Sequence, residues 1–285
     1  MRNFVLVALV AALTASLPAT ASEVALGSGK VLVKQYPGGV TVHAFMTGDA
    51  MNDVASLVET RNGLVAIEAP AFRADISAWK GYIASLKKPL SAVLVSNHPS
   101  NGGWYGNAPV YATDTAKAAI QSGRTKSVIE GVKKGFGDKF ESDIAVVGRR
   151  LDLGRTTFDG VAYEIRPDGA GYAIVLPEQK IVFQHMMGGD THSIIGGPAH
   201  ADFMVKQISQ YQAEGIREIY STHHAPETAD ALARKIAYVQ DVKAAASKAS
   251  DKDAFIAAVK AKYPALQGEK FLKMTAGQFF PAKKQ

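Results

Sequence analysis

In the first third of the chain, short runs of apolar residues alternate with polar ones, which is typical of β-strands. The predicted strands are residues 31–33, 40–45, 55–59 and 64–68. The sequence Arg61-Asn62-Gly63 between the last two runs predicts a hairpin. A helix is expected over 74–86, where apolar residues recur at helical spacing, and the apolar run 92–95 predicts a buried strand after it.

Strand and helix patterns then repeat in the same order. Further short strands are predicted at 109–112, 146–147, 157–158, 161–165, 173–176, 181–183 and 219–221. Helices are predicted from Thr113 to Ile120, at 127–140, around Met204–Tyr211, from Pro226 to Val242, and after a capping box formed by Ser250 and Asp253.

Strands followed by helices, twice over, suit two β-sheets packed face to face with helices on both outer sides. The sequence therefore predicts the α/β class and an αββα sandwich with mixed sheets. No low-complexity linker divides the chain. We therefore expect one domain over residues 22–285, with a C-terminal helical extension from about 226 to 285.

The amino terminus has the pattern of a secretory signal peptide. Arg2 supplies a positive charge, an apolar run extends from Phe4 to Leu17, and Ala19-Thr20-Ala21 fits a cleavage site. We expect residues 1–21 to be removed after Ala21, which predicts a periplasmic or secreted protein. The apolar run is shorter than a membrane span needs, so no span is expected in the mature chain.

Composition narrows the chemistry. The chain has 285 residues and no cysteine, so any metal site must use His, Asp, Glu or water. Its net charge of +6 comes from scattered lysines, and no basic block is interleaved with aromatics, so no nucleic-acid partner is expected. A small-molecule substrate or ligand is predicted instead, and the sequence leaves the oligomeric state open.

Three histidines each follow a short apolar strand, namely His98, His185 and His223. In α/β sheets, ligand and metal groups gather beyond the carboxyl ends of strands. This shared placement makes the three imidazoles candidates for a common site.

The chain resembles the metallo-β-lactamase-fold hydrolase superfamily over roughly 40–242. The matching segments occur in order: NDVASLVETRNGLVAIEAP at 52–70, the strand AVLV, NAPVYAT at 107–113, TFDGVAYEI, AIVLPEQKIVF and STHHAPETAD. The resemblance implies an αββα fold with a metal site at one edge, between the sheets.

The metal motif of that superfamily, His-x-His-x-Asp-His, is degenerate here. The corresponding stretch Ser96-Asn97-His98-Pro99-Ser100-Asn101-Gly102-Gly103 is two residues shorter and retains one histidine. In the aligned positions, His185 falls where the bridging Asp is expected, and His223 matches the last ligand. A two-metal centre needs more ligands than these.

Two hypotheses follow from the resemblance. The first is an exported hydrolase of a small ester, lactone or amide, with one Zn (or Fe or Mn) held by His98, His185 and His223. Asp168 and His98 are its catalytic candidates. The second is an inactive relative without metal that binds a small molecule or acts in regulation. The candidate substrate-binding residues are Asn97, Ser100, Asn101, Trp104, Asp190, His192 and His224.

Overall fold

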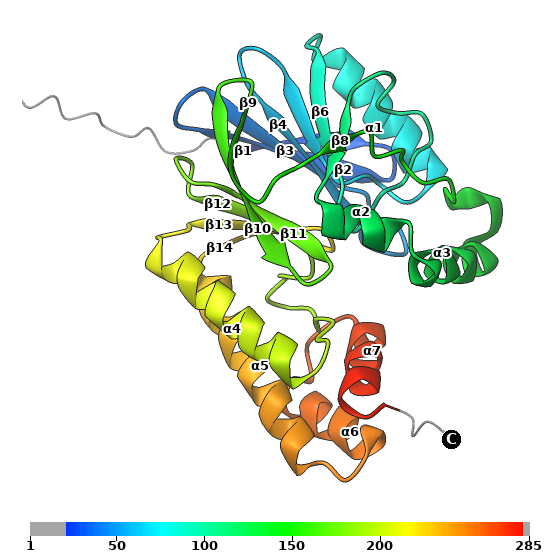
Figure 1. Ribbon diagram of the computed structural model, residues 1–285, viewed down its shortest axis with the longest axis vertical. Helices are drawn as coiled ribbons and strands as arrows, with labels where there is room; N and C mark the ends of the chain where they lie inside the picture. The colour runs from blue at the N-terminus through cyan, green and yellow to red at the C-terminus, as the bar shows by residue number, and fades with distance from the viewer. Residues whose placement is uncertain (1–20, 282–285) are drawn as a thin grey trace, which may run out of the picture.

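The computed structural model describes residues 21–281, apart from the side chain of Arg124; the predicted signal peptide therefore lies almost wholly outside the described residues. Two mixed β-sheets with helices around them form the described part of the chain, so the predicted α/β class and αββα sandwich are confirmed (Figure 1). Within residues 21–281, no helix has the length and apolar character needed to cross a membrane.

The first sheet has eight strands in sequence order. Neighbours are antiparallel from β1 to β5 and parallel from β5 to β8. Its strands are β1 (Ala21–Leu26), β2 (Gly29–Tyr36), β3 (Val40–Met46), β4 (Val54–Glu59), β5 (Leu64–Ile67), β6 (Leu90–Leu94), β7 (Val110–Ala112) and β8 (Arg149–Arg150).

The second sheet has six strands in the order β14-β13-β12-β11-β10-β9, and only β12 and β13 run parallel. Its strands are β9 (Gly154–Phe158), β10 (Val161–Asp168), β11 (Gly171–Leu176), β12 (Ile181–Gln184), β13 (Glu218–Ser221) and β14 (His224–Thr228).

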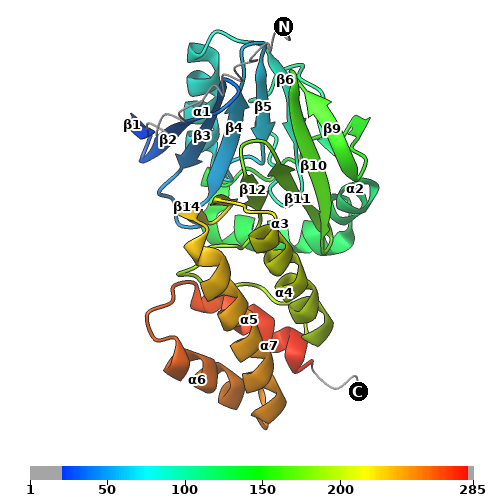
Figure 2. The ribbon, with the colours of Figure 1, turned by 90° about the vertical axis from the view of Figure 1, so that its left-hand side faces the viewer.

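Helices accompany both sheets (Figures 1 and 2). They are α1 (Arg73–Ser85), α2 (Asp114–Ile120), α3 (Gly123–Phe136), η1 (Gly137–Lys139), α4 (Pro198–Ala213), α5 (Asp230–Lys248), α6 (Lys252–Lys262) and α7 (Glu269–Phe279). Trp79 of α1 is buried against the first sheet, where it stacks on Phe45 of β3. Ile208 of α4 and Val239 of α5 pack in a second core with Val175 of the second sheet.

Several boundaries differ from the sequence-based expectations. Pro226, predicted to begin a helix, lies in β14, because this segment pairs with β13 and α5 begins only at Asp230. The residue that caps α6 is Asp251, whose carboxylate accepts the Ala254 N–H, and not Ser250. The strand predicted at 146–147 is absent from the described residues; Val146 is exposed and the short strand β8 follows it.

Candidate functional site

The loop that carries His98 is held by a buried carboxylate. Glu68, directly after β5, accepts hydrogen bonds from the backbone N–H groups of Ser96, Asn97 and His98, at 3.2, 2.9 and 2.8 Å. Charge-assisted bonds of this kind are about twice as strong as neutral ones. Because β5 and β6 are parallel neighbours, both chains leave the sheet at the same edge. The tight turn after β6 is therefore fixed by a residue almost 30 positions earlier.

Ser96 ties the same loop to the second sheet. Its Oγ accepts the N–H of Tyr172 in β11 at 3.0 Å, and the Tyr172 hydroxyl donates to the Val95 carbonyl at 2.9 Å. The position of His98 thus depends on both sheets.

His185 and His223 reach the site from two neighbouring strands. β12 and β13 run parallel with Gln184 opposite Ser221, so the residues that follow them emerge at one edge. One ring nitrogen of each of His98, His185 and His223 lies within 4.8 Å of the other two. The ring centroids are 5.5 Å apart for His98–His185, 4.7 Å for His98–His223 and 5.1 Å for His185–His223. The tertiary structure brings the three histidines together.

A fourth residue, Asp53, was not among the sequence candidates. It is 1% exposed, and its Oδ1 lies 3.3 Å from His223 Nδ1 and 3.6 Å from His98 Nδ1. Neither carboxylate oxygen has a hydrogen-bond partner of good geometry. The Val54 N–H donates to the Thr222 carbonyl at 2.8 Å, which fixes Asp53 beside the turn of His223. An acidic residue directly before a mostly apolar strand was the only available signal in the sequence.

The surroundings of His223 define its tautomer. Its Nδ1 faces the Met51 carbonyl at 3.2 Å and Asp53 Oδ1 at 3.3 Å, and both of these oxygens are acceptors. The Nδ1 atom therefore carries the proton, and Nε2 presents a lone pair. That Nε2 lies 3.1 Å from His98 Nε2.

Without a cation, neither tautomer of neutral His98 suits both of its neighbours, Asp53 and His223. With its proton on Nδ1, toward Asp53, two Nε2 lone pairs oppose each other at 3.1 Å. With its proton on Nε2, the Nδ1 lone pair faces the carboxylate instead. A cation between the Nε2 atoms removes the conflict. Two Zn–N bonds of about 2.1 Å at a tetrahedral angle separate the nitrogens by about 3.4 Å, slightly more than the observed 3.1 Å.

The pKa directions agree with this interpretation. Burial lowers the pKa of His98, and burial with the neighbouring histidines lowers the pKa of His185 far below its usual range. Both imidazoles are therefore neutral near pH 7, as metal ligands must be. Burial acts to raise the pKa of Asp53, but His98 and His223 outweigh it and the pKa is lowered. The residues present thus fit one divalent metal with three imidazole ligands and a carboxylate behind two of them.

A cavity of about 700 Å³ opens beside these residues. Its lining includes His98, His185, Asp168, Asn97 and Ser100. Burial raises the pKa of Asp168 to about 6, which a hydrogen bond with Gln184 partly offsets. Asp168 therefore changes protonation near neutral pH, although it is not among the residues that share the three-histidine cluster.

The other candidates lie elsewhere among the described residues. Trp104 is buried and its indole N–H donates to the Ser100 carbonyl, while Asn101 Oδ1 accepts the Gly103 N–H within the turn. His192 is buried against the Tyr238 hydroxyl at 2.9 Å. His224 turns away from His223 and pairs with Asp190 and Glu227. None of Asn101, Trp104, Asp190, His192 and His224 is among the residues that line the cavity.

Solved structures share this arrangement of sheets and helices. A metallo-β-lactamase from Erythrobacter litoralis aligns with a TM-score of 0.53 and 16% identity, covering 77% of this chain and 99% of its own. A metallo-β-lactamase family protein from Thermus thermophilus gives a TM-score of 0.60 at 12% identity, covering 85% and 91%. The chain has the metallo-β-lactamase fold.

A stereoselective inverting sec-alkylsulfatase from Pseudomonas sp. also aligns with this fold, with a TM-score of 0.58 at 15% identity. The match covers 87% of this chain and 49% of the sulfatase. No family model matches the sequence, and no curated protein matches it. Identities this low establish the fold alone, so the function must be argued from the site.

Proposed function

We propose that the protein is an exported, metal-dependent hydrolase with a single divalent metal, zinc in the first instance, held by His98, His185 and His223. The observation that carries the proposal is the pair of Nε2 atoms 3.1 Å apart, whose Nδ1 atoms both face the buried carboxylate of Asp53. This arrangement directs two imidazole lone pairs at one point. Histidine ligands backed by a carboxylate are common at zinc sites.

The substrate of the proposed reaction is a small ester, lactone or amide. When bound, a divalent metal supplies Lewis acidity, which polarises a carbonyl oxygen and makes water a better nucleophile. The protein provides the surroundings. Asp168 lines the same cavity and, with a pKa of about 6, can accept and return a proton near neutral pH. Asn97 and Ser100 offer hydrogen bonds that orient the substrate.

Metal content tests the proposal directly. We expect about one equivalent of zinc, iron or manganese per chain after mild dialysis of the purified protein. His223→Ala should lose it, whereas His224→Ala, next in the chain but turned toward Asp190, should keep it. Less than a tenth of an equivalent in the unmodified protein, with no thermal shift on adding divalent metal, would reject the metal site.

The alternative is an inactive relative that binds a small molecule. One observation favours it: among residues 21–281, the three histidines form the only group of metal-type side chains that converge, so a two-metal centre is not supported. A protein that binds no metal and hydrolyses no ester, lactone or amide, yet still binds a ligand in the cavity, would establish this alternative.

A further inference from the structure

The walls of the cavity are strongly apolar away from the histidines. Val128, Ile129 and Val132 of α3 line one side, and Met204 of α4, Met274 of α7 and Ile194 line the other. All but Ile194 come from helices that lie far apart in sequence (Figure 1). The cavity therefore has a polar end at His98 and His185 and apolar surface on α3, α4 and α7, where His200 and Gln278 are also among the lining residues.

The apolar surface continues to the mouth of the cavity. Val128 is 55% exposed and Met274 is 47% exposed, although both side chains line the cavity. Large apolar side chains exposed beside a pocket commonly mark a surface that contacts a ligand. An alkyl chain would cover them and gain the free energy of removing apolar surface from water.

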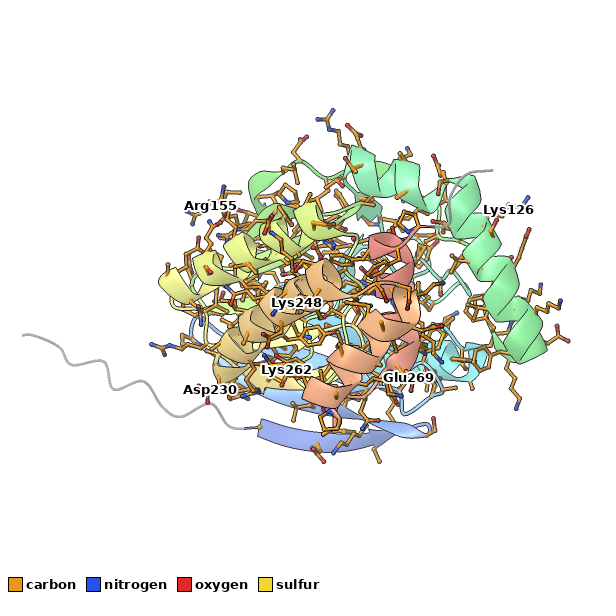
Figure 3. All side chains as sticks on the ribbon, turned by 90° about the horizontal axis from the view of Figure 1, so that it is seen from below. Lys126, Arg155, Asp230, Lys248, Lys262 and Glu269 are labelled. Atoms are coloured by element: carbon orange, nitrogen blue, oxygen red, sulfur yellow. The ribbon has the colours of Figure 1, made fainter. Side chains whose placement is uncertain are left out.

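The described carboxylate side chains give the lining of the cavity a negative charge. Glu141, Asp143 and Asp168 line it, and no lysine or arginine is present among the lining side chains that the structure describes. Arg73, whose Nε lies 3.7 Å from Glu141 Oε2, is about half exposed and does not line the cavity. Lys126 lies on the outer side of α3 (Figure 3). Among the described side chains that line the cavity, an anionic tail would find no cation to pair with, which costs free energy.

From these observations we infer that the substrate is an ester or lactone with an unbranched alkyl or acyl chain, and that this chain carries no carboxylate, sulfate or phosphate. The carbonyl group of the substrate lies at the histidine end, and its alkyl or acyl chain lies between α3 and α7. This inference rests on the hydrolase function proposed above and specifies its substrate class. A cationic amphiphile fits less well, because the three imidazoles already require a cation at the polar end.

The first test compares substrates that differ in one feature. For 4-nitrophenyl esters of unbranched acids, each added methylene buried in the cavity is worth up to about fourfold in kcat/KM, from about 0.8 kcal/mol. We expect at least a tenfold rise from the butanoate to the octanoate ester. The mono-4-nitrophenyl ester of suberic acid, of equal length with a terminal carboxylate, should react at least tenfold more slowly than the octanoate.

A substitution at the mouth of the cavity tests the location. Val128→Lys should lower kcat/KM for the octanoate at least fivefold and reduce its advantage over the suberate ester at least tenfold. Val146→Lys, at a valine that is 76% exposed and outside the cavity lining, should leave both rates unchanged. Equal responses of the two variants would overturn the assignment.

Binding separates this inference from the proposed function. Calorimetry with 2-decanone, which cannot be hydrolysed, should show binding at least tenfold tighter than 2-butanone and weaker binding to Val128→Lys. Binding of this kind without ester hydrolysis would refute the hydrolase and leave the cavity assignment standing. Hydrolysis that depends on neither chain length nor terminal charge would overturn the substrate class and leave the hydrolase standing.

Discussion

Replacement of Asp53 by asparagine removes the charge that orders the candidate metal centre while keeping the shape of the side chain. The carboxylate is fully buried, and its Oδ1 faces the Nδ1 atoms of both His223 and His98, at 3.3 and 3.6 Å. In Asp53→Asn, an amide that can donate takes the place of an obligate acceptor. His98 is then free to adopt the other tautomer, with its proton on Nε2.

The expected effect is a 10- to 100-fold weaker affinity for zinc, the usual cost of losing a carboxylate partner behind histidine ligands. This corresponds to about 1.4–2.7 kcal/mol. Because two ligands share this one carboxylate, we expect a value in the upper half of that range. The assay is competition for zinc against a chromophoric chelator at pH 7.5.

Asp75→Asn is the matched control. Asp75 is buried in the first turn of α1 and interacts electrostatically with Asp53, but it makes no ion pair with the histidines. This variant removes a nearby negative charge without changing the tautomers, so zinc affinity should change less than threefold. If Asp53→Asn binds zinc as tightly as the unmodified protein, or if both variants lose affinity equally, the tautomer argument is refuted.

Three further predictions concern buried charged groups. Glu68→Gln should lower the free energy of unfolding by about 2–4 kcal/mol in urea titrations, because three charge-assisted bonds to the His98 loop are weakened. The control Glu178→Gln, at an exposed glutamate, should change this free energy by less than about 0.5 kcal/mol. Burial lowers the pKa of Lys235 from 10.5 to about 7. Between these pH values the unfolded chain binds one more proton than the folded chain, so the free energy of unfolding should rise by up to about 1.4 kcal/mol per pH unit. Lys235→Met should lack this rise between about pH 7 and 9. If Asp168 is the base, kcat/KM should increase as the pH rises through about 6, because the Asp168 carboxyl ionises there. Asp168→Asn should abolish this pH dependence and lower kcat/KM about 100-fold. An unchanged pH profile would exclude that role for Asp168.

The sequence predicted a good part of the fold because its strands and helices have strong local patterns. The hairpin at Arg61–Gly63 forms with Thr60 Oγ1 accepting the N–H groups of Asn62 and Gly63. Thr113 caps α2 as expected from its position, by accepting the Ala116 N–H. Pro226 is suited to the first turn of a helix, but its segment instead forms the strand β14 and pairs with β13. Local preference is a weak guide where a strand edge is available for pairing.

The sequence by itself determined that His98, His185 and His223 each follow a short apolar segment. Only the tertiary structure decided that the three imidazoles converge, because that depends on how two sheets pack. It also added Asp53, which is 45 positions from His98 and 170 from His223, and Glu68, whose hydrogen bonds shape the His98 turn. Buried charges act through distance and geometry, and no local sequence pattern records which distant residues a carboxylate will face.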